Sequence, residues 1–481
     1  MNIMKQLLFF LLLITQSFAK QPNIIFILTD DQGYGDIARH GHPLLDTPHL
    51  DALWDESVKF DNFYVSPSCS PTRAALMTGM HEFMSGVTHT IIPREHMSQE
   101  MTTLPTLLRD AGYKTGFVGK WHLGGGVGFS PNFRGFQWMS TNVGGPHQHF
   151  DVQMRRNGKL HQTAGYREDQ FCNEGMEFIK EAGDNPFFLY LATYSPHAPY
   201  DAPADLVEKY AAKGVTDKQA KYLGMIENID MNIGRLRQYL VDTGKAQDTI
   251  LIAMNDNGIT EGLDIYNANM RGCKCTAWQG GTRAFSLWNW PTHWEPALIK
   301  EELTAHLDVL PTLCQLAGVD LPESLLPQLE GKSLVPLLEG RKSPWHEKRI
   351  LYHNVARWTS GYAQYHKNHN CGVRQGDYLL RRSSHCGQPG CRIKFSPCAL
   401  LKLIEQGQKS AHYTEGNAQH HWGVSGPEWE LYNVKSDPAN QHNLAESHPD
   451  LVHTLSSSYN QWWEGMYDTM IARGGDATKA E

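Results

Sequence analysis

The sequence lacks an excess of positive charge. It has 51 Asp and Glu residues against 43 Lys and Arg residues, which gives a formal net charge of −8. Proteins that bind nucleic acid or another polyanion over a broad surface carry the opposite balance, so this class is excluded. An anionic substrate must instead meet positive groups that are gathered in one pocket.

The sequence also lacks an apolar run of bilayer length. The run from Leu7 to Ile14 is too short to span a membrane, and no longer one follows. Lys5 precedes this run and the small residues Ser17 and Ala19 follow it, which is typical of a cleaved secretory signal. No cysteine lies nearby to take a lipid anchor. We therefore predict a signal peptide over 1–19 and an exported protein, periplasmic or secreted, with no integral membrane segment.

No internal repeat or low-complexity block interrupts the chain. Its 481 residues exceed what one hydrophobic core usually organises, which predicts two domains. Near residue 345 the composition changes to one rich in His, Arg, Gly and Cys. We predict a larger domain over 20–344 and a smaller C-terminal α+β domain over 345–481 that contains a short antiparallel sheet.

Near-continuous apolar runs predict strands that are buried on both faces, as in a parallel sheet. They cover residues 23–29, 114–118, 187–193 and 249–254. Between the last two runs, apolar residues at positions 226, 229, 233, 236 and 240 have the spacing of an amphipathic helix. Strands that alternate with helices predict an α/β fold, with a largely parallel sheet flanked by helices.

Polar side chains follow each of the four predicted strands. They are Asp30 and Asp31, Lys120 and His122, His197, and Asp256 and Asn257. Because the carboxyl ends of parallel strands meet at one edge of a sheet, we expect these side chains to converge there on one site.

The segment Cys69-Ser70-Pro71-Thr72-Arg73 precedes a run of good helix formers. Pro71 suits the first turn of a helix, so Cys69 would lie at a helix N-terminus, where an anion is favoured. Arg73 lies one turn further on and can hold an oxyanion with two donors. The alternative is a buried structural cysteine before an ordinary helix.

This spacing resembles the maturation signature of type I sulfatases, in the alkaline phosphatase superfamily. Further segments resemble blocks of the same family in the same order, and the chain as a whole is similar to bacterial arylsulfatase-like polysaccharide sulfatases. These segments are 23–35, 119–124, 196–199, 255–258 and 271–283. The resemblance implies an alkaline-phosphatase-like fold. It also implies that Cys69 becomes formylglycine (3-oxoalanine), through a formylglycine-generating or anaerobic sulfatase-maturating enzyme, and that the hydrated aldehyde attacks a sulfate ester.

The resemblance also implies roles for the cations and histidines. Arg73, Lys120 and Lys274 would neutralise the sulfate oxygens. His122 would bond the hydrate and take its proton when the sulfated intermediate collapses. His197, with Lys274, would protonate the leaving oxygen, a role that suits a group titrating near neutral pH.

Asp30, Asp31, Asp256 and Asn257 offer only oxygen ligands, which suits a hard cation, Ca²⁺ or Mg²⁺, rather than zinc. The resemblance favours one calcium ion, with an oxygen of the modified Cys69 as a further ligand. Taken singly, the acid pairs could be helix caps or turn residues.

The cysteines give further expectations about disulfides and about the surroundings of Lys274. If Cys69 is modified, eight cysteines remain, which fits disulfides in an exported protein. We expect two bridges among Cys371, Cys386, Cys391 and Cys398; a zinc site that includes His385 is the alternative. Cys273 and Cys275 flank Lys274, where the family usually has small residues, and they either bridge elsewhere or stay buried thiols. Gln279 stands where the family often has Glu.

Together these features predict a sulfatase that acts on a sulfated carbohydrate. We expect His89, Arg94, His353 and Arg357 to read the sugar, because they lie in loops or in the second domain; a surface strand of that domain is the alternative for the last two. Two other functions stay open. One is a phosphate or phosphonate ester hydrolase that uses the same aldehyde, and the other is an inactive homologue that only binds sulfated glycan.

Overall fold

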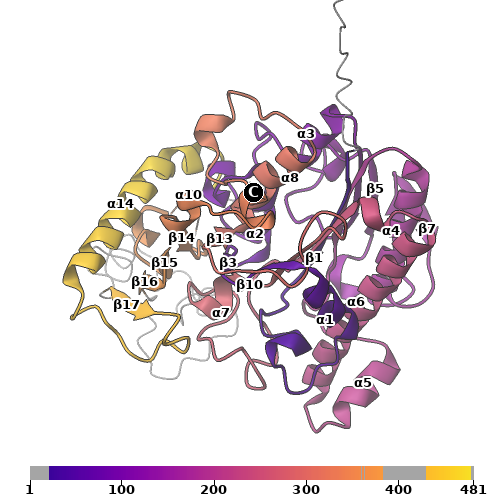
Figure 1. Cartoon of the computed structure of the whole chain (residues 1–481), viewed down its shortest axis with the longest axis horizontal. Coiled ribbons are helices and arrows are strands. Elements are labelled where there is room, and N and C mark those ends of the chain that lie inside the picture. The colour runs from indigo at the N-terminus through magenta and orange to yellow at the C-terminus, as the bar shows by residue number, and fades with distance from the viewer. Residues whose placement is uncertain (1–20, 359, 362, 383–428, 478–481) are drawn as a thin grey trace, which may run out of the picture.

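A computed structural model of the chain describes residues 21–358, 360–361, 363–382 and 429–477. Figure 1 shows a large body of sheet and helices beside a smaller C-terminal part. The predicted signal peptide lies outside the described residues, and so do Cys386, Cys391, Cys398 and His385.

The large body is built on a mixed ten-stranded sheet. Its order is β12 (Ile299–Lys300), β2 (Val58–Phe60), β11 (Ser286–Asn289), β9 (Thr249–Asn255), β1 (Asn23–Thr29), β8 (Phe187–Ala192), β4 (Lys114–Gly119), β5 (Trp138–Asn142), β6 (Gln153–Arg156) and β7 (Lys159–Gln162). The central run from β9 to β5 is parallel, while β11, β6 and β7 pair antiparallel with their neighbours. The four predicted strands are therefore confirmed as neighbours at the centre of the sheet.

Both faces of this sheet are covered, because alternate residues of each central strand point to opposite sides. In β1, Ile25 and Ile27 belong to a core with α1 (Pro48–Glu56), α4 (Arg167–Ala182) and α6 (Asp217–Asp242). Ile24, Phe26 and Leu28 belong to a second core with α2 (Cys69–Thr78), α3 (Leu104–Asp110), α8 (Val309–Leu316) and α9 (Val335–Leu338). Helix α5 (Ala204–Ala211) packs on α6. Burial on both faces explains why these strands read as unbroken apolar runs.

Smaller elements connect this body to the C-terminal part. A three-stranded sheet joins β10 (Arg283–Ala284), β3 (Phe63–Tyr64) and β13 (Thr304–Ala305), and two single-turn helices are α7 (Gln279–Thr282) and α10 (Pro344–Glu347). The C-terminal part is an antiparallel sheet of β14 (Ile350–Asn354), β15 (Cys371–Gln375), β16 (Tyr378–Arg382) and β17 (Glu430–Asn433), with the long helix α14 (Pro449–Ala472) along its outer side (Figure 1). The predicted fold class, a largely parallel α/β sheet plus a small antiparallel C-terminal sheet, is confirmed.

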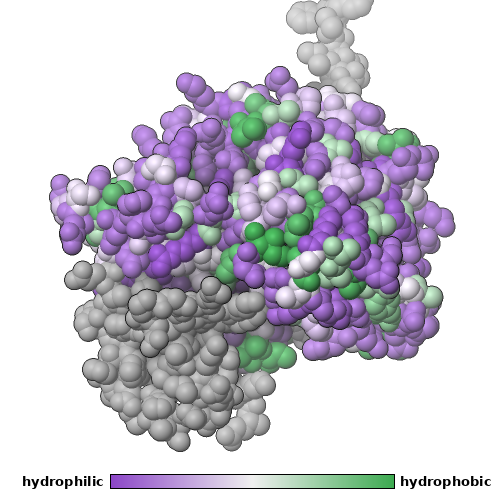
Figure 2. Space-filling model, turned by 90° about the horizontal axis from the view of Figure 1, so that it is seen from below, coloured by the Kyte–Doolittle hydropathy of each residue, from purple (hydrophilic) through white to green (hydrophobic). Residues whose placement is uncertain are grey.

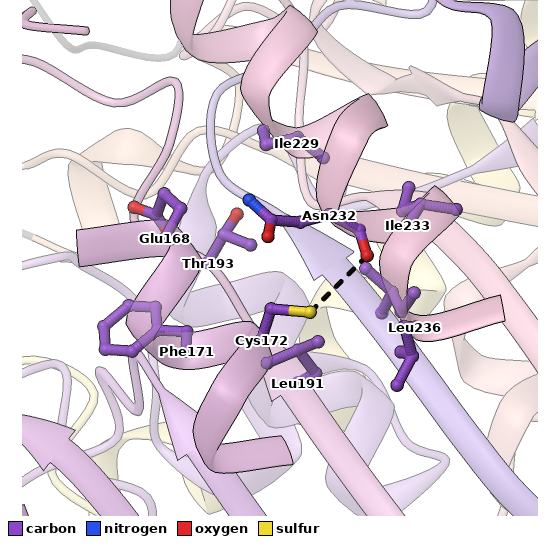
Figure 3. A pocket seen from close by; sticks show the side chains of 10 residues that line it. Glu168, Phe171, Cys172, Leu191, Thr193, Ile229, Asn232, Ile233 and Leu236 are labelled. Atoms are coloured by element: carbon purple, nitrogen blue, oxygen red, sulfur yellow. Dashed lines mark hydrogen bonds between the residues drawn. The ribbon is translucent and has the colours of Figure 1, made fainter. Parts of the chain in front are cut away.

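A small cavity lies inside the core between α4, α6 and the sheet (Figure 3). Its volume is about 20 Å³, and Cys172 Sγ donates across it to the Asn232 carbonyl at 3.5 Å. Glu168 and Thr193 line the same cavity, so it lies directly behind the loop that follows β8. The cavity therefore borders the base of that loop.

The described surface is mostly hydrophilic, with a group of hydrophobic residues near the middle of the face in Figure 2. Among the described helices, none is long and apolar enough to cross a membrane.

The cysteines differ from the expectation. No disulfide joins two of the described cysteines, and Cys371, which was expected to form a bridge, is a buried free thiol on β15. Cys275 is also a buried free thiol, which is the second of the two alternatives given for it. Each thiol is small and apolar enough to pack in a core without a partner, which a count of cysteines does not reveal.

Candidate active site

The polar ends of β1, β4, β8 and β9 meet at one edge of the sheet, as expected. In register, Leu28 lies beside Ala192 and Thr29 beside Asn255, so Asp30 and Asp256 leave the sheet next to each other. The backbone N–H of Asp256 donates to the Thr29 carbonyl at 3.0 Å.

Helix α2 brings Cys69 to this edge, because the helix begins at this residue. Cys69 is only 1% exposed, and Arg73, one turn later, is fully buried. The Arg73 guanidinium donates to the Lys120 carbonyl at 2.7 Å and to Asp256 Oδ2 at 2.9 Å. The predicted helix start is therefore found, and Arg73 lies one turn further on with its guanidinium against Asp256.

Each cation of the site lies against a carboxylate. Lys120 Nζ lies 2.5 Å from Asp30 Oδ2, and Lys274 Nζ lies 2.5 Å from Asp31 Oδ1. Burial alone would lower the pKa of Lys274, but the charges of Asp31, Cys69 and Asp30 together outweigh it and raise the pKa above its ordinary value. Both lysines are thus held in their charged form.

The carboxylates and Asn257 fit a cation. One ligand atom from each of Asp30, Cys69 and Asp256 lies within 4.8 Å of the others. Asp30 Oδ1 and Asn257 Oδ1 are buried and have no hydrogen-bond partner among the described residues. Burial and the neighbouring Asp30 raise the pKa of Asp256 well above its ordinary value, although Arg73 opposes this shift, as expected where buried acids crowd together. A divalent cation would satisfy these oxygens and remove that repulsion.

The charged groups of the site also shift the pKa of Cys69. Burial would raise the pKa of the thiol, but Lys120, Lys274 and His122 outweigh it and lower the pKa well below its ordinary value. The position therefore favours a negatively charged atom, which suits a nucleophile that must carry developing negative charge.

His122 is held by two groups that the sequence analysis did not identify. Its Nε2 lies 3.1 Å from the Thr90 carbonyl oxygen and 3.3 Å from Glu95 Oε2. These contacts orient the ring so that Nδ1 can face Cys69. Thr90 and Glu95 lie in an irregular segment with no periodic pattern, so only the tertiary structure reveals them.

His197 lies in the loop after β8 and lines the same cavity as Cys69 and His122. Its Nε2 is 3.7 Å from Asp31 Oδ2, and burial lowers its pKa. Helix α4 anchors this loop, because Glu168 Oε1 accepts from both the N–H and the hydroxyl of Ser195, at 3.1 and 2.8 Å. The two histidines thus stand on separately supported loops.

A cavity of about 610 Å³ opens over these residues. Its lining includes Cys69, Lys120, His122, His197 and Lys274, together with residues beyond the reacting centre. These others are Asp31, Thr90, Pro146, Tyr194, Ala198 and Arg357.

Of the four residues expected to read the sugar, only Arg357 lines this cavity. Arg94 is 3% exposed, and its guanidinium bonds backbone carbonyl groups. His353 is buried on β14 and lines a separate cavity of about 280 Å³. His89 accepts from the N–H of Thr90 at 2.7 Å and lies beside the cavity without lining it. Burial thus argues against direct substrate contact for Arg94 and His353, since position in a loop or in the second domain does not reveal which way a side chain points.

Comparisons with known proteins agree with this geometry. A family model described as Sulfatase matches residues 22–319, and one described as N-sulphoglucosamine sulphohydrolase, C-terminal, matches residues 276–384. The chain is 31% identical to human N-acetylgalactosamine-6-sulfatase, over 72% of this chain and 71% of that protein. It is 28% identical to mouse arylsulfatase J, over 92% of this chain and 76% of that protein.

Among solved structures, the chain is similar to Ps i-CgsB in complex with k-i-k-neocarrahexaose. The TM-score is 0.76 at 24% identity, over 92% of this chain and 93% of that one.

Proposed function

Because the chain belongs to the sulfatase family of the alkaline phosphatase superfamily, and is therefore a sulfuric ester hydrolase, we propose that it removes sulfate from a sulfated carbohydrate. The relatives support the substrate class, since one is an N-acetylgalactosamine-6-sulfatase and one structure contains a neocarrahexaose. The main support for the proposal is the position of Cys69. This residue is buried at the start of α2, beside Lys120, Lys274 and the acidic cluster, which consists of Asp30, Asp31 and Asp256.

We propose that Cys69 acts after conversion to formylglycine. Lys120 and Lys274, which line the cavity, would bind sulfate oxygens as point charges, and Arg73 pairs with Asp256. His122, oriented by Glu95 and Thr90, holds and removes a proton at residue 69. His197, which also lines the cavity, gives a proton to the leaving oxygen.

Asp30, Asp31, Asp256 and Asn257, with residue 69, would hold one calcium ion. Their donor atoms are all oxygens, which supports calcium over zinc. The bound ion would supply positive charge that stabilises the charge developing on the sulfate.

The upstream steps are also proposals. The Cys69-Ser70-Pro71-Thr72-Arg73 signature supports maturation by a formylglycine-generating or anaerobic sulfatase-maturating enzyme. The apolar run in 1–19 supports export to the periplasm or the exterior.

Three measurements on purified enzyme test the proposal. Peptide mass spectrometry should show the sulfur of Cys69 replaced by oxygen. Turnover of an aryl sulfate should exceed turnover of the matching aryl phosphate, and Cys69→Ser should remove nearly all of it. Faster hydrolysis of the phosphate would support a phosphate or phosphonate ester hydrolase instead. Binding of sulfated saccharide without release of sulfate would support an inactive glycan-binding homologue.

A further inference from the structure

Arg94 is buried, and its guanidinium donates hydrogen bonds to the backbone on both sides of Arg357. Its Nη1 donates to the Trp358 carbonyl and its Nη2 to the Ala356 carbonyl, both at 2.6 Å. The planar guanidinium suits this two-point contact, because its donors have a fixed fork geometry. Arg357 is the single residue between the two carbonyl groups that Arg94 holds.

The remaining contacts of Arg94 tie this segment to the main body. Its Nε donates to Thr88 Oγ1 at 2.9 Å, and its guanidinium lies 4.7 Å from the centre of the Trp358 ring. Arg357, in turn, donates from Nη2 to Thr90 Oγ1 at 3.1 Å. The segments 88–94 and 356–358 therefore brace each other along one wall of the cavity.

A second anchor comes from beyond the end of α14. Asp476 Oδ1 accepts from Trp358 Nε1 at 2.8 Å and from the N–H of Gly361 at 2.9 Å, and Asp476 Oδ2 accepts from the N–H of Ala363 at 3.2 Å. The residue that follows Arg357 is thus held by Arg94 through its carbonyl and by Asp476 through its side chain.

We propose that Arg94 and Asp476 are positioning residues for substrate recognition. Together they fix segment 356–358 so that Arg357 presents its guanidinium to the cavity, toward an anionic or hydroxyl group of the saccharide beyond the scissile sulfate. The inference rests on the proposed function, in which Arg357 contacts the saccharide. Recognition by a residue in an irregular segment depends on such support, because ordering the segment at each binding event would cost affinity.

The test compares two substrates, the native sulfated saccharide and a small aryl sulfate. Asp476→Ala removes three accepted hydrogen bonds, and Arg94→Lys keeps the charge but cannot span two carbonyl groups. We expect each variant to raise KM for the saccharide, and to lower the ratio of saccharide to aryl sulfate kcat/KM about fivefold to tenfold, which is less than the full loss of a charge-assisted hydrogen bond because Arg357 itself is retained. Asp468→Ala removes an exposed acid of α14 and is the matched control, with an unchanged ratio.

The decisive measurement repeats both substitutions in a protein that also carries Arg357→Ala. If the two residues act through Arg357, neither Asp476→Ala nor Arg94→Lys should lower the ratio further in that background. Additive losses would overturn the inference and leave the proposed role of Arg357 intact. A ratio unchanged by Arg357→Ala itself would overturn that role instead, and the positioning inference with it. Hydrogen exchange of segment 355–363 should rise in both single variants, and unchanged protection would also overturn the inference.

Discussion

At the scale of single residues, the charges of the site cancel in pairs. Lys120 is bound by Asp30, Lys274 by Asp31, and Arg73 by Asp256. These carboxylates are also the proposed ligands of calcium. An oxygen that binds a cation is less available to a lysine, so occupancy of the acidic cluster would leave Lys120 and Lys274 for the oxygens of the substrate.

The acidic cluster gives a prediction about metal removal. We expect that chelator-treated enzyme gains thermal stability when calcium is added, about 2.7 kcal/mol at a calcium concentration 100-fold above Kd. Asp256→Asn should lose most of this gain, because it removes a charged ligand. Differential scanning calorimetry measures it, with the exposed Asp110→Asn as control. Equal gains in Asp256→Asn and the wild type would contradict the site.

His197 gives a prediction about the leaving group. We expect His197→Ala to reduce turnover of a sugar sulfate by about 10²–10⁴, because an alkoxide is a poor leaving group that needs a proton. An activated aryl sulfate needs little protonation and should lose far less. Steady-state rates on both substrates measure the difference, and equal losses would reassign His197 to sulfate binding.

Glu95 gives a prediction about the orientation of His122. Glu95→Gln weakens a charge-assisted contact, so we expect kcat to fall about tenfold for both substrates with little change in KM. Glu95→Asp should restore part of the loss. The exposed Glu100→Gln, from the same part of the chain, is the control. A normal kcat in Glu95→Gln would show that the Thr90 carbonyl is sufficient.

At the scale of elements, the sequence predicts best what is buried on two faces. The apolar run 23–29 matches β1 residue for residue, and Pro71 places the start of α2 correctly. The hairpin of β6 and β7 was missed, since segments such as Gln153–Arg156 are polar at the edge of a sheet and carry little pattern. The same limit applies to the site: residues at strand ends were predictable, but Glu95, which reaches the site across a loop, was not.

The short helix η2 (Glu82–Ser85) carries a buried acid that gives a prediction about pH. Burial raises the pKa of Glu82 to about 8, from an ordinary value of 4.5. Between these values the folded chain keeps a proton that the unfolded chain releases, so this residue makes stability fall as pH rises from 4.5 to 8. Glu82→Gln removes the titration, so its stability relative to the wild type should increase over that window. Urea unfolding at pH 5 and pH 8 measures this, and a constant difference would contradict it.

At the scale of the whole molecule, one shared core joins the main body to the C-terminal part. Phe83, which follows α2 in the main body, is 1% exposed. The centre of its ring lies 6.0 Å from that of Trp358 and 5.8 Å from that of Trp463. Its cluster otherwise consists largely of residues from the C-terminal sheet and α14. The predicted boundary at 345 therefore separates two parts of the sequence that bury their side chains together.

This shared core predicts cooperative unfolding. We expect Phe83→Ala to destabilise the protein by about 3–5 kcal/mol, the usual range for a buried aromatic residue. Both parts should still melt in one transition, since each loses its support with the other. The half-exposed Phe133→Ala is the control. Two separate calorimetric transitions in the wild type would contradict this coupling.

The burial of Cys69 also determines when it can be modified. Its thiol is enclosed once α2 has docked against the sheet, and its neighbours Ser70, Pro71 and Thr72 are buried with it. An enzyme that acts on this residue needs the segment in an extended, accessible form. If Cys69 is matured as proposed, the conversion would therefore have to precede the docking of α2, and a chain that folds first would lack the proposed nucleophile.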